Sequence, residues 1–378
     1  MQKKLIAAAV AGAFVAPAAF AQSTVTIGGT IYTEVGHVST DRYADGNIFQ
    51  TPGSELSIKG EENLGGGMSA WFQCNTTFDV RGSDPQGLCG RNSALGLKGG
   101  FGNVYVGNWD TPFKRVGGVN RIVNETGAFG ASFLLTGGAS TFLGAANRAS
   151  FSRRQNNSVN YDSPNFKGFQ FMFATNTDNT ATALTQGAAN AKPRVTSLGA
   201  TYNMGPMNFG AAYEKHSNFG TAGTAPSLDD KGWLLSAGYT VGPVRLGAIY
   251  TQQKFQTTAS AESKVKVWHL AADWQIAGPH GLRAGYTRAG DVTGTAGSAS
   301  VAGSSAVRPA VGSSTGAKLW QISYVNTLSK RTEATIGYAK LDNDSNAQYA
   351  LGGTYSTSSL PTAGNNSSVW GLGLRHRF

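Results

Sequence analysis

The residues best suited to acid–base chemistry lie on either side of one polar segment. Glu214 and His216 stand two positions apart, and Asp229 and Asp230 follow a stretch rich in Gly, Thr and Pro. A carboxylate, an imidazole and a third polar group within hydrogen-bond reach could activate water at an outer rim. Charged residues beside polar loops are usually solvated, and this is the nearest approach to a catalytic constellation in the chain. We therefore expect no enzymatic activity.

Cys74 and Cys89 are the only thiols of the chain. They are expected at the ends of two neighbouring strands, on either side of a polar loop, in a protein exported to an oxidising compartment. We therefore expect a disulfide that ties the base of the loop, contributing about 3 kcal/mol in the chain-entropy model. No histidine cluster accompanies them, so neither a metal site nor a cofactor is expected.

Basic side chains offer a third kind of chemistry, the attraction of anions. The formal net charge is +10, and the basic residues are spread singly rather than in a run, which argues against a polybasic anchor. Lys59, Arg91 and Arg154 share the parity expected to face water, where like charges on a low-dielectric wall concentrate counter-ions. Nucleic acid is not an expected partner, because the chain carries an export signal.

The longest connection, residues 110–155, strengthens this basic excess. Its two acidic residues are Asp110 and Glu125. Its six basic residues are Lys114, Arg115, Arg121, Arg148, Arg153 and Arg154. If this connection folds inward, it brings positive charge to a constriction.

The elements that must position these residues are two-faced strands. In the last eleven residues, 368–378, Trp370, Leu372, Leu374 and Phe378 alternate with small residues and arginines. This period of two predicts a strand with an apolar and a polar face. About sixteen such strands can be counted, and 51 glycines, 14% charged residues and no long apolar run exclude a helical membrane protein.

The connections between the strands indicate how they are arranged. Tight turns such as 204–206 and 242–243 alternate with long polar loops such as 177–193, 218–230, 292–316 and 342–366. Alternation of this kind is typical of an up-and-down barrel with its loops outside. We therefore predict an all-β fold: a sixteen-stranded antiparallel transmembrane β-barrel, wide enough to hold an aqueous channel, with its third loop folded inward.

The N-terminus predicts export. Lys3 and Lys4 precede an apolar run over residues 5–16, and Ala19-Phe20-Ala21 forms a small-residue cleavage site. We expect residues 1–21 to be a signal peptide and residues 22–378 to be one barrel domain.

Several motifs together resemble the general porins of Gram-negative bacteria, in particular the beta-proteobacterial branch. The motifs are TVTIGGTIYTEVG, SELSIKGEENLGGGMSAWFQ, RNSALGLKGGFGNVYVGNWDTPFKR, NNSVNYDSPNFKGF and the GLRHRF ending. The resemblance implies a trimer in the outer membrane, in contact with its lipid, with Arg91 and Arg154 at lumen positions. It also implies that Phe378 is the terminal aromatic read by the barrel assembly machinery.

Two positions depart from the family pattern. Glu55 lies where relatives commonly have a basic residue, and Asn108 lies in a segment that often reads GRQ. Both changes remove positive charge from the wall, so we expect only weak anion selectivity.

The sequence thus predicts a passive channel for small hydrophilic solutes and inorganic ions. Residues 110–155 would set its size limit, and Lys59, Arg91 and Arg154 much of its charge bias. A substrate-selective channel, or a barrel whose long loops bind a partner, remains an alternative. Ion selectivity tests the first of these hypotheses. Block of conductance by one solute would indicate a substrate-selective channel, because a general channel shows no such block.

Overall fold

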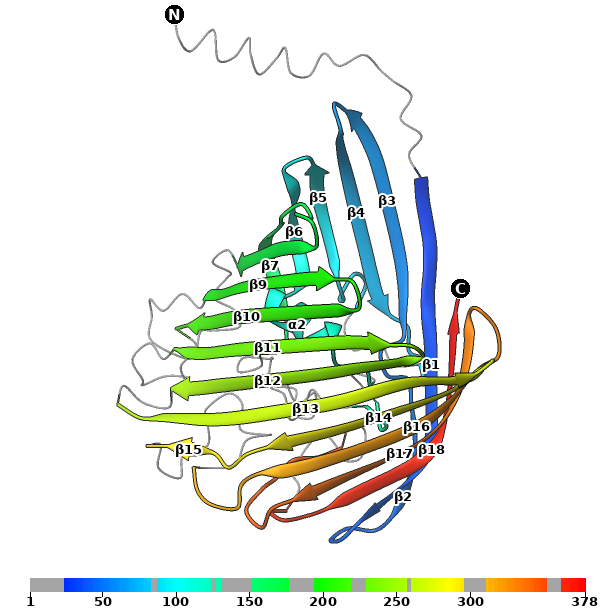
Figure 1. The fold of residues 1–378 in the computed structure, drawn as a ribbon, viewed down its shortest axis with the longest axis vertical. Coiled ribbons are helices and arrows are strands. Elements are labelled where there is room, and N and C mark those ends of the chain that lie inside the picture. The colour runs from blue at the N-terminus through cyan, green and yellow to red at the C-terminus, as the bar shows by residue number, and fades with distance from the viewer. Residues whose placement is uncertain are drawn as a thin grey trace, which may run out of the picture.

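The computed structural model describes residues 24–378 except 83–86, 124–126, 131–150, 177–193, 219–228, 257–259, 296–310 and 352–361. The expected signal peptide lies outside these residues. Every strand pairs antiparallel with its neighbours, and the first strand, β1 (Thr24–Thr40), pairs with the last, β18 (Ser367–Arg377). The sheet therefore closes on itself as a barrel (Figure 1).

Sixteen strands make up the wall, as predicted, and two short ones, β2 (Gly46–Gln50) and β15 (Thr293–Gly294), extend it at β1 and β13. Between β1 and β18, the wall strands are β3 (Glu55–Gly65), β4 (Met68–Thr77), β5 (Ser93–Gly99), β6 (Gly102–Asp110), β7 (Arg154–Asp162), β8 (Phe169–Asn176), β9 (Arg194–Met204), β10 (Met207–Ser217), β11 (Asp230–Val241), β12 (Val244–Gln256), β13 (Glu262–Ala277), β14 (His280–Ala289), β16 (Ala317–Thr327) and β17 (Thr332–Asn343).

The two ends of the barrel differ in their connections. Tight turns join β3 to β4, β5 to β6, β9 to β10, β11 to β12, β13 to β14 and β16 to β17 at one end, called here the turn end. Most connections at the other end, the loop end, are long. The expected alternation fails once there, because β12 and β13 are joined by residues 257–261 alone.

The outward face of the wall is apolar, and the inward face is mixed. Exposed large side chains such as Leu235, Leu270, Trp320 and Leu372 point out from their strands. On the loop-end half, Trp268, Tyr286 and Trp320 form a chain of ring contacts with centroids 4.9 and 4.1 Å apart. Aromatic belts of this kind mark the level of a membrane interface.

One helix lies inside the barrel. It is α2 (Pro112–Val119), and it packs against the inner face of β9, β10 and β11 (Figure 1). No helix in the described ranges is long and apolar enough to cross a membrane.

Candidate functional site: the lumen and its inward loop

The third loop begins with a capped helix that the sequence signals clearly. Thr111 is the N-cap of α2, where its hydroxyl accepts from the Lys114 amide, and Pro112 occupies the first turn. Phe113 and Val116 are buried against the wall, and the Phe113 amide donates to the Ser197 hydroxyl at 3.1 Å. The helix is therefore fixed to the wall, and the predicted inward fold of the loop is present.

After the helix, the loop crosses the strands one by one. Asn120 donates to the Ser236 hydroxyl on β11 at 3.3 Å. On β13, the His269 Nε2 lies 2.9 Å from the Arg121 carbonyl oxygen, which accepts from it. The other nitrogen of this ring lies 2.8 Å from the Thr287 hydroxyl, and the Gln321 amide on β16 donates to the Phe129 carbonyl at 3.2 Å.

The loop reaches the first strand at a buried carboxylate. Glu34 is 0% exposed and accepts from the Ala128 amide at 2.7 Å. It also accepts from the Tyr32 hydroxyl at 2.6 Å and the Gln50 amide at 2.7 Å. Three donors compensate this buried acceptor, so Glu34 fixes one end of the described loop segment to β1.

Glycines on the inward face leave room for the loop. We call six of them the wall glycines: Gly199, Gly210, Gly238, Gly247, Gly285 and Gly337. A Cβ at Gly210 would lie 2.6 Å from Val116, and one at Gly337 would lie 2.6 Å from the Phe129 ring. At Gly247 it would fall on the Asn120 carbonyl oxygen. Glycine inside a strand marks close approach of another backbone, so glycines at these strand positions are the sequence signal that could have located the loop.

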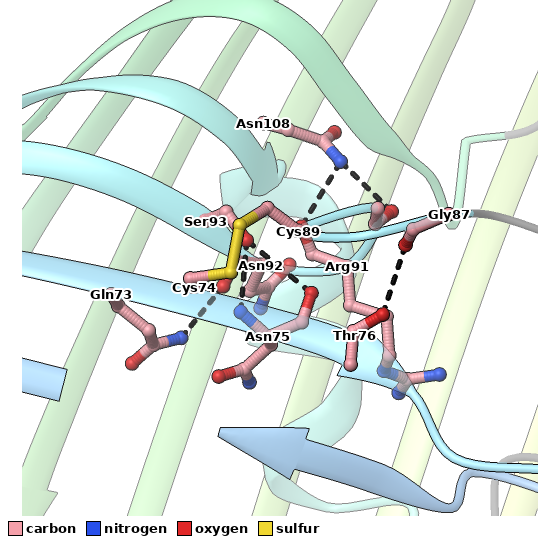
Figure 2. The surroundings of a disulfide bond; sticks show 11 residues. Gln73, Cys74, Asn75, Thr76, Gly87, Cys89, Arg91, Asn92, Ser93 and Asn108 are labelled. Atoms are coloured by element: carbon pink, nitrogen blue, oxygen red, sulfur yellow. Dashed lines mark hydrogen bonds between the residues drawn. A yellow bond between two sulfur atoms is a disulfide. The ribbon is translucent and has the colours of Figure 1, made fainter. Parts of the chain in front are cut away.

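Arg91 is placed by a cross-linked loop base. Cys74 and Cys89 form the expected disulfide, with a Cα–Cα separation of 4.7 Å (Figure 2). Beside it, the Arg91 amide donates to the Asn75 carbonyl at 2.9 Å, and Asn108 donates to the carbonyl of Arg91 at 3.0 Å. Asn108, one of the two departures from the family pattern, therefore positions a basic residue.

The other departure neutralises the same residue. The Arg91 Nε lies 2.9 Å from a carboxylate oxygen of Glu55, and both side chains are about a quarter to a third exposed. The pair faces the lumen from β3 and the adjoining loop base. Arg91 thus contributes little net charge to the lumen.

Lys114 and Arg154 share a single carboxylate. The Asp110 oxygen lies 3.0 Å from Lys114 Nζ and 3.4 Å from Arg154 Nε. Arg154 also donates to Asn92 at 2.6 Å, which fixes its guanidinium beside the loop base. Two cations of the loop therefore converge on the same carboxylate.

Arg115 is held by Asp162 on β7. Its two terminal nitrogens donate to the two carboxylate oxygens at 2.7 and 2.9 Å, and one of them also donates to the Tyr105 hydroxyl at 3.0 Å. Burial opposes the charge of this guanidinium, but the hydrogen bonds to Asp162 and the nearby Tyr105, Asp162 and Asp110 together raise the pKa of Arg115. A bidentate pair of this kind is fixed in geometry.

The remaining predicted site residues lie in different surroundings. Lys59 is exposed on the inward face of β3, and no carboxylate of the described residues makes an ion pair with it. Arg121 is 5% exposed, so it is buried against the wall rather than open to water. Glu125 and Arg148 lie outside the described residues. Phe378 closes the last strand, with its amide and carbonyl paired to Gly29 at 3.1 Å.

The residues suited to acid–base chemistry lie in two places, a buried group and an outward ion pair. His216 and Glu214 are 0% exposed and 2.8 Å apart, and the ring of Phe151 stacks on His216 with centroids 4.5 Å apart. Asp229 instead pairs with Lys215 on the outward side at 2.7 Å. The stacked Phe151 ring anchors the end of the third loop to this cluster. Burial lowers the pKa of the neighbouring Arg153 to about 10, so its guanidinium stays charged beside Glu214 and Asp230.

A closed barrel of sixteen strands with a charged loop laid along its inner wall defines a membrane channel. The chain belongs to the Gram-negative porin family, whose model matches residues 7–347. This confirms the family that the motifs indicated.

Individual relatives agree with this assignment. The outer membrane porin protein 32 of Delftia acidovorans is 27% identical over the full length of both chains. The major outer membrane protein P.IB of Neisseria gonorrhoeae is 33% identical over 45% of this chain, and the chain spans about half the length of that relative, 46%. Among solved structures, an anion-selective porin from Comamonas acidovorans has the same fold, with a TM-score of 0.74, 23% identity and coverage of 94% of this chain and 100% of its own.

Proposed function

We propose that the protein is a passive, water-filled channel of the outer membrane for small hydrophilic solutes and inorganic ions, with a weak preference for anions. The observation that supports this proposal is the third loop. Its described part lies along the inner wall from β9 to β1 and brings basic side chains, most of them paired, into the lumen. No energy source or cofactor is needed for diffusion through such a channel.

The charge balance supports a weak preference rather than a strong one. Arg91 and Arg115 each have their own carboxylate, Glu55 and Asp162. Lys59 forms no ion pair with a described carboxylate, and Lys114 and Arg154 share Asp110. Fixed charges on a low-dielectric wall raise the local counter-ion concentration, but compensated pairs do so only slightly.

Reversal potentials across planar bilayers in a salt gradient test this proposal. Wild type should favour anions slightly, and changing Arg91 and Arg154 together to Gln should move the reversal potential toward cations. The change leaves Glu55 and Asp110 with fewer cations, so the lumen becomes more negative. Lys340→Gln is the control, because Lys340 points outward from β17 and should not alter the potential. Cation preference in wild type, or no shift in the double variant, contradicts the charge assignment.

A substrate-selective channel is a second candidate, favoured by one cluster of rings. Trp71, Tyr105 and Trp109 contact one another on the inward face, with centroids 5.2 to 5.8 Å apart. Such a surface could bind a planar solute beside Arg115. This candidate predicts that one solute class blocks conductance at low concentration, whereas a general channel shows no such block.

Three further properties follow from the family. We propose that the chain functions without catalytic turnover, that it assembles as a homotrimer, and that Phe378 is read by the barrel assembly machinery. The terminal ring is 43% exposed, so it is accessible at the turn end. Replacing Phe378 by Ser should reduce the amount of folded protein in the membrane fraction.

A further inference from the structure

Four lysines lie directly opposite one another across four adjacent strands. Lys215 on β10 faces Lys231 on β11, Lys231 faces Lys254 on β12, and Lys254 faces Lys264 on β13. We call these four residues the lysine row. All four share the outward parity of Tyr213, Trp233, Tyr250 and Trp268, so they point away from the lumen. At a strand spacing of about 4.8 Å, the row is about 14 Å wide.

Carboxylates neutralise only part of this row. Lys215 pairs with Asp229 at 2.7 Å, and Lys254 pairs with Glu262 at 3.0 Å. Lys231, Lys264 and the adjoining Lys266 form no ion pair within the described part of the chain. Asp230 does not help, because it is buried and turned inward toward His216.

The two loops that join strands of the row at the loop end supply no further acid, and Asp291, after β14, accepts from the backbone amides of Thr315 and Gly316. Residues 219–228, between β10 and β11, and residues 257–259, between β12 and β13, include no charged side chain. Like charges directly opposite each other destabilise a sheet. A row of this kind is therefore suited to an anion from outside the chain.

The level of the row identifies which anion can reach it. The row lies at the loop end, just beyond the aromatic side chains that mark the interface, including Trp233 and Tyr250 with centroids 5.3 Å apart. If the loop end faces outward, as in porins, lipid phosphates of the outer leaflet lie at this height. The connection between β12 and β13 is short, because β12 ends at Gln256 and β13 begins at Glu262.

An apolar groove lies on the same strands, toward the membrane centre. Its volume is about 620 Å³, and the side chains on its floor are small: Ala200, Ala211, Ala237 and Ala248. Larger residues form its walls, among them Phe169, Tyr202, Phe209, Leu235, Tyr250 and Trp268. It begins four to six residues below the row, or roughly 13 to 20 Å along a strand, which is the depth of acyl chains.

We propose that the lysine row and this alanine groove together bind a phosphorylated glycolipid of the outer leaflet. The phosphates lie on Lys231, Lys264 and Lys266, and one acyl chain lies along the alanines. A headgroup with two phosphates fits a row of this width better than a single phosphate does. This inference rests on the proposed outer-membrane location, but not on the ion preference of the channel.

Lipid retention by the purified full-length protein tests the proposal. The protein is reconstituted in nanodiscs that contain defined diphosphoryl lipid A, and the lipid that stays bound is counted by native mass spectrometry. Changing Lys231, Lys264 and Lys266 together to Gln should reduce retention at least tenfold, since each surface lysine contributes to attraction of anionic lipid. The matched control changes Lys318 and Lys340, which also point outward near the loop end but lie outside the row.

A second variant separates the groove from the charges. Ala237→Phe adds a ring to the groove floor on a surface already facing lipid, so folding should be retained while lipid retention falls several-fold. Inorganic phosphate should not displace the lipid, because it lacks acyl chains. Phosphatidylcholine should be retained poorly by wild type.

Several results would overturn the proposal. These are equal retention in the triple variant and wild type, equal loss in the control, equal retention of phosphatidylcholine, or dissociation of the oligomer in the triple variant. The last result would assign the row to subunit contact. The reversal potential of the triple variant should match wild type, so failure here is distinguishable from failure of the proposed channel function.

Discussion

Arg115 inside the barrel and Lys231 on its outer rim have the same charge but opposite surroundings. Arg115 is held bidentately by Asp162, whereas Lys231 stands between Lys215 and Lys254. The same contrast holds for the sets around them. In the lumen, Glu55, Asp110 and Asp162 balance most of the described cations near α2, while the rim set has five lysines, with Lys266, against Asp229 and Glu262.

The formal net charge is +10, and 8 remains (10 minus 2) without Lys3 and Lys4 of the expected signal peptide. The difference between the two sets shows which parts of the barrel carry it. A count of basic residues would assign much of it to the constriction, because residues 110–155 are so basic. Pairing offsets more of that charge in the lumen than at the rim. We therefore expect a weak electrostatic effect on solutes and a stronger attraction for anions of the surrounding membrane.

The largest effect on this contrast is expected at Glu34. Glu34→Ala removes the acceptor of three buried donors, so the folded barrel should lose roughly 3 kcal/mol of stability and release the loop from β1. Urea unfolding and single-channel recordings measure the two effects. Glu262→Ala removes an exposed rim carboxylate instead, and should cost less than about 1 kcal/mol. Equal losses of stability in the two variants would contradict the proposed difference between charged groups in the lumen and at the rim.

Removing a paired lumen cation should have an intermediate effect. Arg115→Gln leaves Asp162 without its bidentate partner, so stability should fall by about 2 kcal/mol and the reversal potential should move toward cations. Lys254→Gln leaves Glu262 unpaired on the outer surface, where water replaces the contact. If Lys254→Gln shifts the potential as much as Arg115→Gln does, the rim lysines act on the lumen after all.

A wall glycine should give the smallest of the three effects. Gly247→Ala places a methyl group against the Asn120 carbonyl, so the loop must move toward the barrel axis and lower the conductance, at a cost of about 1 kcal/mol. The control is Gly281→Ala, because a methyl group there would lie 3.5 Å from its nearest atom. Unchanged conductance in Gly247→Ala would show that the loop is not held at this point.

Strand pattern was the most predictable part of the molecule. Alternation along 368–378 and its repeats predicted the wall, because lipid outside and water inside impose a period of two. The alternation of turns and loops held except between β12 and β13. The sequence also contains the Thr111-Pro112 start of α2, a capping signal from which the helix could have been predicted.

The partners of the charged residues were not predictable in the same way. Arg115 and Asp162 are 47 positions apart, and Arg91 and Glu55 are 36 apart, so their pairing depends on the register of the closed barrel and on the position of α2. The departure at Glu55 predicted a loss of positive charge, and Glu55 forms an ion pair with Arg91. The role of Asn108 in holding the Arg91 segment could not be read from its position in the sequence.

The wall glycines have a consequence for how such a pore could change in size. Since the loop rests on bare backbone, the free cross-section depends on residues that no passing solute touches. A methyl group added behind the loop would push the loop toward the barrel axis and narrow the opening. The pore diameter could thus be changed at wall residues, while every charged residue that meets the solute stays the same.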